Sequence, residues 1–221
     1  VIRGDQSDGA LLVGDRVGRV ARHGKQLALV GEQPVGEHAG GEAVVLVHLG
    51  MTGQLRAMPN GTRSPGDHVH MTWWLRSRAG EPTGRLIFRD PRRFGGVWSL
   101  PTRAALAERW SELGPDALEI TGSVLWSRLR ARNDQPKRTS IKAALLDQRV
   151  LAGVGNIYAD EACFRAGIDP RRQAGSLSRA QIDRLAREVR FVLARAVAAG
   201  GSTLRDYVDA NGTAGEAQLL H

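Results

Sequence analysis

The spacing of apolar residues changes near residue 102, and this change limits what the chain can fold into. Before it, short β-branched or aromatic runs are separated by Gly and Pro, as in strands joined by turns. After Pro101, apolar residues recur every three or four positions, as in helices. The sequence therefore predicts an α+β fold, with a β-sandwich or barrel in residues 1–102 and an all-α domain in residues 103–221. The predicted strands are residues 17–20, 26–30, 43–49, 68–75 and 85–90.

The helical half contains start and stop residues for individual helices. Residues 178–181, Ser-Arg-Ala-Gln, form a capping box, and Gly200-Gly201 ends the helix that the box begins. A second helix begins near Asn156 and ends at residues 167–170, Gly-Ile-Asp-Pro. The buried face of the long helix is predicted to consist of Ile182, Leu185, Val189, Val192 and Ala196.

A glycine turn opens the helix at Asn156. In Gly153-Val154-Gly155-Asn156 the backbone N–H groups of the following helix are free to bind an anion. The turn lacks the leading strand and third glycine of a dinucleotide site, and a Gly-x-Gly turn taken alone is more often an ordinary loop. It follows a positive run, which indicates a nucleic-acid backbone as the anion. That run comprises Arg128, Arg130, Arg132, Lys137, Arg138, Lys142 and Arg149.

The composition supports a polyanionic partner. The 221 residues carry a formal net charge of +8, with a pI near 10.8. Nucleic acid is favoured over membrane because the basic residues accompany no long apolar helix. The single cysteine, Cys163, lies in a helical pattern and is predicted to be a core residue. No Gly-x-Ser-x-Gly elbow or Cys-x-x-Cys pair is present, which weakens hydrolase and structural-zinc interpretations.

Two loops that follow predicted strands carry candidate DNA contacts. Residues 89–95 place Arg92, Arg93 and Phe94 between Pro and Gly, which suits phosphate clamping and base stacking. A solvated hairpin is the alternative. Residues 48–53 hold Met51 between glycines, where it could wedge a duplex open, although an apolar tip is more often part of a core.

Other titratable residues are weaker candidates. Lys25 precedes an apolar strand, where partial desolvation would make its amine a nucleophile or general acid; otherwise it is a surface residue. His68 and His70 lie two apart on a predicted strand and hence on one face, but no third metal ligand accompanies them. A phosphate or structural hydrogen bond is the favoured role of His68.

Taken together, these motifs resemble the formamidopyrimidine-DNA glycosylase and endonuclease VIII family over nearly the whole chain. The resemblance implies a helix-two-turns-helix domain, double-stranded DNA with oxidised or abasic sites as partner, excision of oxidised or ring-opened purines, and β- and δ-elimination. It is carried, in order, by Lys25, residues 48–53, 90–95, 139–142, 153–161 and 200–206.

The resemblance also implies roles for individual residues. Lys25 matches a catalytic lysine that donates a proton in β-elimination. Met51, Arg92 and Phe94 match three residues that enter the space of the flipped nucleotide, and Arg93 lies in the same loop. The positions at or near phosphate contacts in relatives are His48, His68, Lys137, Lys142 and Asn156.

Two features of the family are missing from these residues. Relatives attack the sugar with an N-terminal proline followed by glutamate, and they continue into a zinc finger of four cysteines. Neither is present, so we expect a central portion of a longer enzyme, little base excision by this chain, and no metal or cofactor in it, although a complete parent would bind zinc. A non-catalytic damage-binding protein and a general nucleic-acid module are the alternatives. We also expect a cytoplasmic monomer without membrane association.

Overall fold

The computed structural model describes residues 2–3, 11–32, 43–63, 66–130 and 138–200. Within these residues the chain forms two compact units. The first contains residues up to Arg22 together with Gln26–Ala107, and the second contains His23–Lys25 together with Glu108–Ala198. The tip of the first hairpin therefore belongs to the helical unit, and helix α1 (Arg103–Ser111) spans the division.

The larger sheet of the first unit has the strand order β1-β8-β4-β3-β2. Strands β3 and β4 pair antiparallel, as do β4 and β8, whereas β1 is parallel to β8. The predicted strands at residues 17–20, 26–30 and 43–49 are confirmed as β2, β3 and β4. The strands of this sheet are β1 (Ile2–Arg3), β2 (Arg16–His23), β3 (Gln26–Glu32), β4 (Val44–His48) and β8 (Gly96–Leu100).

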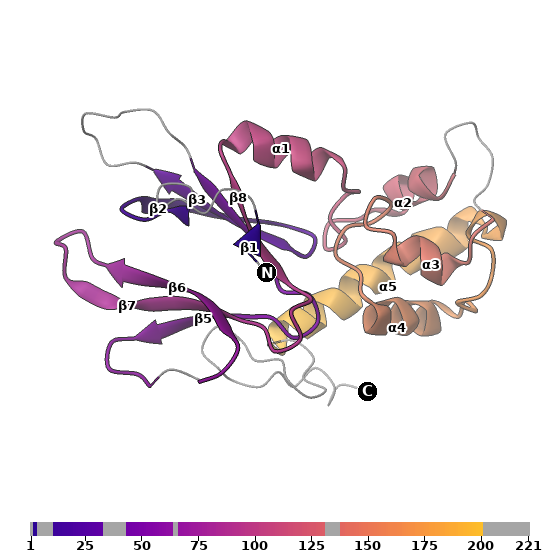
Figure 1. Cartoon of the computed structure of the whole chain (residues 1–221). Coiled ribbons are helices and arrows are strands. Elements are labelled where there is room, and N and C mark those ends of the chain that lie inside the picture. Colours follow the sequence, from indigo (N-terminus) through magenta and orange to yellow (C-terminus); the bar gives the residue numbers. More distant parts are fainter. Residues whose placement is uncertain (1, 4–10, 33–42, 64–65, 131–137, 201–221) are drawn as a thin grey trace. The chain divides into compact units, whose positions relative to one another are not determined.

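A second, antiparallel sheet faces the first, and the two form the layers of a sandwich (Figure 1). Its order is β5 (Gln54–Pro59), β7 (Pro82–Arg89) and β6 (Val69–Arg76). The core between the sheets is aliphatic with one phenyl ring, as expected for alternating strands that bury one face. The predicted sandwich is confirmed, and β5 and β8 are strands that the sequence pattern missed. The buried core cluster contains Leu12, Leu29, Val45, Val47, Phe88 and Val97.

The second unit is helical, as predicted. Its helices after α1 are α2 (Gly122–Leu129), α3 (Ile141–Leu146), α4 (Asn156–Ala166) and α5 (Arg179–Ala198), with a 3₁₀ turn at Ala174–Ser176. The predicted face of α5, from Ile182 to Ala196, is buried. Cys163 is also buried among these helices, and burial raises the pKa of its thiol to about 11, as suits a core residue.

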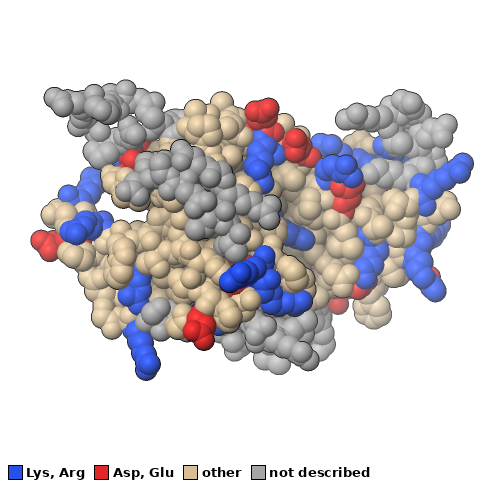
Figure 2. Space-filling model, viewed as in Figure 1, with Lys and Arg blue, Asp and Glu red and all other residues tan. Residues whose placement is uncertain are grey.

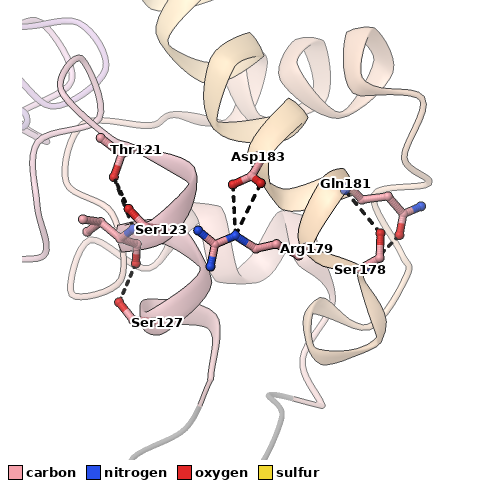
Figure 3. A network of polar contacts seen from close by, with 8 residues as sticks. Thr121, Ser123, Ser127, Ser178, Arg179, Gln181 and Asp183 are labelled. Atoms are coloured by element: carbon pink, nitrogen blue, oxygen red, sulfur yellow. Dashed lines mark hydrogen bonds and ion pairs between the residues drawn. The ribbon is translucent and has the colours of Figure 1, made fainter.

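Short polar contacts define the helix ends in this unit. Ser178 and Gln181 form the predicted capping box at the start of α5, where the Ser178 N–H donates to Gln181 Oε1 over 3.0 Å (Figure 3). The next residue, Arg179, points toward Asp183 one turn further along α5, with Nε 3.2 Å from Oδ1. Gly167 ends α4 in the left-handed conformation, at φ 65°. Gly201 lies outside the described residues.

Candidate nucleic-acid interface

The turn that carries Lys25 is held by groups of the helical unit. The Gly24 N–H donates to Asp116 Oδ2 over 2.8 Å, and His23 Nε2 lies 2.8 Å from the carbonyl oxygen of Gly114. Gly24 has a φ of +56°, and a Cβ there would lie 2.8 Å from the Cβ of Ala152. Only glycine fits this turn, because both the backbone conformation and the close approach exclude a side chain.

The same turn brings Lys25 to the beginning of α4. A Cβ built on Gly155 would lie 3.6 Å from Lys25 Nζ. Gly155 is the N-cap of α4 and supplies no side-chain acceptor, and Asn156, the first helical residue, is exposed. The first N–H groups of a helix have no intrahelical acceptors and attract anions. One ammonium and one helix N-terminus therefore face the same place, which suits a phosphate.

Lys25 is an exposed residue, but the protein around its ammonium group removes part of its hydration. This desolvation lowers the pKa of Lys25 below the usual lysine value. No carboxylate of the described residues forms an ion pair with it. A lysine of this kind exchanges protons more readily near neutral pH than an ordinary surface lysine does.

In the first unit, the three side chains expected to enter a duplex lie on two adjacent loops. Met51 is 68 % exposed and Phe94 is 56 % exposed. The Arg92 guanidinium carbon lies 4.7 Å from the centre of the Phe94 ring. The loops abut, since a Cβ on Gly50 would lie 2.6 Å from Gly95 N. A thioether, a guanidinium and a phenyl ring are thus presented to solvent from one edge of the sandwich.

Asp90 joins these two loops, and the sequence reasoning did not single it out. Its carboxylate is buried and accepts hydrogen bonds from Thr52 Oγ1 over 2.6 Å and from Gly95 N over 2.7 Å. Its carbonyl oxygen lies 2.9 Å from His70 Nε2. An Asp-Pro pair at the end of a strand was the available indication, because such aspartates bond to nearby backbone N–H groups.

The structure separates the two histidines that the sequence placed on one strand face. His68 precedes β6 and has a φ of +68°, so the alternation of the strand does not extend to it. Its carbonyl oxygen accepts the Asp90 N–H over 3.0 Å, whereas His70 points toward Asp90. The prediction that both histidines lie on one strand was therefore wrong, because His68 adopts a left-handed backbone conformation before β6 begins.

The remaining predicted contacts differ in their surroundings. Lys142 Nζ lies 2.7 Å from Asp160 Oδ2, so an anion would compete with that carboxylate. His48 Nδ1 accepts the Gly50 N–H over 3.0 Å. Arg93 is exposed and has a φ of +57°. Lys137 lies outside the described residues.

Basic side chains are spread over strand and helix regions alike on the face shown in Figure 2, and acidic ones are sparser. Within the described ranges, no three His, Cys, Asp or Glu residues are grouped as metal ligands would be. No helix in this part of the chain is long and apolar enough to cross a bilayer.

Comparison with known proteins accounts for both units. Residues 2–97 match the family model of the formamidopyrimidine-DNA glycosylase N-terminal domain. Residues 113–208 match that of the formamidopyrimidine-DNA glycosylase H2TH domain. The two matches together define a DNA glycosylase of the helix-two-turns-helix class.

Curated relatives agree with the family models. The formamidopyrimidine-DNA glycosylase of Syntrophotalea carbinolica is 42 % identical over 209 residues, which cover 93 % of this chain and 69 % of that protein. That of Cupriavidus pinatubonensis is 43 % identical over 215 residues, covering 95 % of this chain and 72 % of the relative. The chain belongs to the formamidopyrimidine-DNA glycosylase family.

Solved structures show the same fold. The MutM (Fpg) protein of Thermus thermophilus has a TM-score of 0.75 and 36 % identity, over 96 % of this chain and 72 % of that one. The Lactococcus lactis Fpg, in complex with DNA containing an abasic site, has a TM-score of 0.74 and 27 % identity. That match covers 95 % of this chain and 70 % of the relative.

Proposed function

We propose that this protein recognises damaged duplex DNA. We propose that it excises oxidised or ring-opened purines and then nicks the strand by β- and δ-elimination. The observation that carries the proposal is the position of Lys25 Nζ, 3.6 Å from where a Gly155 Cβ would be, at the start of α4. A cation and a helix N-terminus at one point bind a phosphate better than either does alone. The Lactococcus lactis relative was crystallised with damaged DNA, which supports the same partner here.

The exposed side chains of the sandwich suit recognition of a missing or flipped base. Met51 and Phe94 offer apolar surface that gains free energy on entering a base stack, and stacking with Arg92 keeps the Phe94 ring in place. Arg92 also supplies donors for the base left without a partner. These interactions need a gap in the stack, so they favour damaged over intact duplexes.

Lys25 is the residue of the described chain best suited to proton transfer during elimination. Its pKa is lowered by desolvation, which increases the fraction of neutral amine near neutral pH. The nearby phosphate site would hold the sugar-phosphate backbone within its reach. We infer that Lys25 exchanges a proton with the abasic sugar while the adjoining phosphate is gripped at the start of α4.

Binding to two matched duplexes tests the proposal. One duplex contains a tetrahydrofuran abasic analogue and the other is intact, and fluorescence anisotropy measures both affinities at one salt concentration. We expect at least tenfold tighter binding to the abasic duplex. Equal affinities would instead indicate a general nucleic-acid module. Borohydride trapping on a natural abasic duplex then separates a lyase, which forms a covalent adduct, from a protein that only binds damage.

We further propose that the protein acts as a monomer in the bacterial cytosol, where chromosomal DNA is found. The relatives named above are bacterial, which supports this location. Light scattering during gel filtration, without DNA, measures the oligomeric state, and a dimer mass would contradict the proposal.

A further inference from the structure

Gln148 lies between the end of α3 and the glycine turn, and its side-chain amide makes three hydrogen bonds. Oε1 accepts the Gly153 N–H over 2.9 Å. Nε2 donates to the carbonyl oxygen of Val154 over 3.1 Å and to that of Leu146 over 2.9 Å. A primary amide is the side-chain group that can accept one bond and donate two in this way.

The turn lies between two well-held points, where the buried Val154 side chain anchors it in the core and few other polar contacts fix its peptide groups. Upstream, Ala152 is fixed by backbone bonds, its N–H to the carbonyl of Pro115 and its carbonyl to the N–H of Ala117. Downstream, the ladder of α4 begins with the Ala159 N–H bonding to Gly155 O. Among the described residues, no other side chain bonds to Gly153 or Val154. Gly153 has a φ of +117°, a conformation that glycine leaves easily.

We propose that Gln148 is a positioning residue for DNA binding, which fixes the glycine turn so that the start of α4 and Lys25 face one phosphate. The inference rests on the function proposed above. Gln148 acts through Gly153 and Val154, since its amide is engaged with the backbone. Without it, the N–H of Gly153 and the carbonyl of Val154 lose their partners, and the peptide groups on either side of the buried Val154 can tilt. The N-terminus of α4 then no longer holds a fixed direction toward the anion.

The test compares two glutamine-to-methionine variants of the full chain. Gln148→Met keeps side-chain length and removes all three bonds. Gln181→Met is the matched control, because Gln181 also bonds a backbone N–H at a helix start, that of Ser178, at a helix that we do not place at the DNA. Anisotropy with the tetrahydrofuran duplex gives the affinity of each protein over a series of salt concentrations, and circular dichroism gives its melting temperature.

Gln148→Met is expected to weaken binding about tenfold and to make the slope of log K against log salt shallower by about 0.9, the value for one phosphate contact. Gln181→Met is expected to lower the melting temperature and to leave affinity and slope unchanged. If Gln148→Met changes only the melting temperature, Gln148 has a merely structural role and the proposal fails.

A second variant at the same position keeps the test decisive if Gln148→Met does not fold. Gln148→Asn keeps a neutral amide but is one methylene shorter and cannot make all three bonds at once, so we expect it to fold and to bind more weakly than the original chain. Unchanged binding by this variant would overturn the proposal. Failure of the proposed function is recognised separately, because the original chain would then show no preference for the abasic duplex.

Discussion

Single buried carboxylates determine the geometry of the two regions that are candidates for DNA contact. Asp90 organises the loops of Met51 and Phe94, and Asp116 holds the turn of Lys25. Both carboxylates accept backbone N–H groups and are themselves largely hidden from solvent. Their contribution is geometric, because a buried carboxylate with matched donors permits few alternative arrangements of the chain around it.

The affinity for DNA should depend on pH through Lys25. The lowered pKa means that its ammonium loses its charge at a lower pH than the usual 10.5. The charged form binds phosphate. The affinity for DNA is therefore highest at pH values below the lowered pKa and falls as the pH rises through it. Anisotropy from pH 7 to pH 10 measures this. Lys25→Arg stays charged throughout and should flatten the profile, whereas an identical profile in that variant would exclude Lys25 as the titrating group.

Removing the Asp90 carboxylate should destabilise the first unit. Asp90→Ala leaves the Thr52 hydroxyl and the Gly95 N–H without their acceptor, and we expect the free energy of unfolding to fall by about 2–4 kcal/mol. Urea denaturation measures the loss. Asp67→Ala is the matched control, since Asp67 is exposed and, among the described residues, is bonded only through its backbone carbonyl, by Arg89. Equal losses in the two variants would contradict the assigned role.

At the scale of secondary-structure elements, the tip of the hairpin of β2 and β3 belongs to the helical unit. Residues His23–Lys25 pack with that unit although the strands on both sides belong to the sandwich. The tip is fixed by Asp116, by Gly114 and by contact with Ala152. The hairpin thus delivers an amine to the start of a helix that is more than a hundred residues away in sequence.

Gly24→Ala should disturb this element more than an alanine at another glycine with positive φ. Gly24 and Gly61 have φ values of +56° and +78°, but only at Gly24 would a Cβ meet a neighbour, Ala152, at 2.8 Å. Gly61→Ala should cost about 1 kcal/mol from backbone strain. Gly24→Ala should cost at least about 1 kcal/mol more and should also weaken DNA binding. Thermal unfolding and anisotropy measure the two effects. Equal losses of stability and affinity in the two variants would show that close packing at Gly24 is unimportant.

At the scale of the whole molecule, net positive charge and local apolar contacts make separate contributions to DNA binding. The charge of +8 attracts any nucleic acid, and the exposed thioether and phenyl ring respond only to a gap in the base stack. The two contributions should therefore separate when the ionic strength is changed.

Raising the salt concentration should weaken binding to the abasic and to the intact duplex and leave the preference for the abasic duplex unchanged. If Lys25 with the start of α4, Arg93 and Lys142 make about three phosphate contacts, affinity should fall about fortyfold between 50 and 200 mM salt. The ratio of abasic to intact affinities should change little, because Met51 and Phe94 are uncharged. Anisotropy titrations of both duplexes measure this ratio, and its collapse with salt would show that the preference is electrostatic.

Local patterns in the sequence determined the two-part α+β architecture, the capping box and buried face of α5, and the glycine turn before α4. These features depend on periodicity and on residues next to one another, which a linear reading contains. Tertiary structure alone decided that Asp90 joins two loops, that Gly24 packs on Ala152, that Gln148 holds the glycine turn, and that Lys25 reaches the start of α4. Each of these joins segments that are separate in the chain or turns on the direction of one side chain, and hydrogen-bond direction and close packing operate in three dimensions.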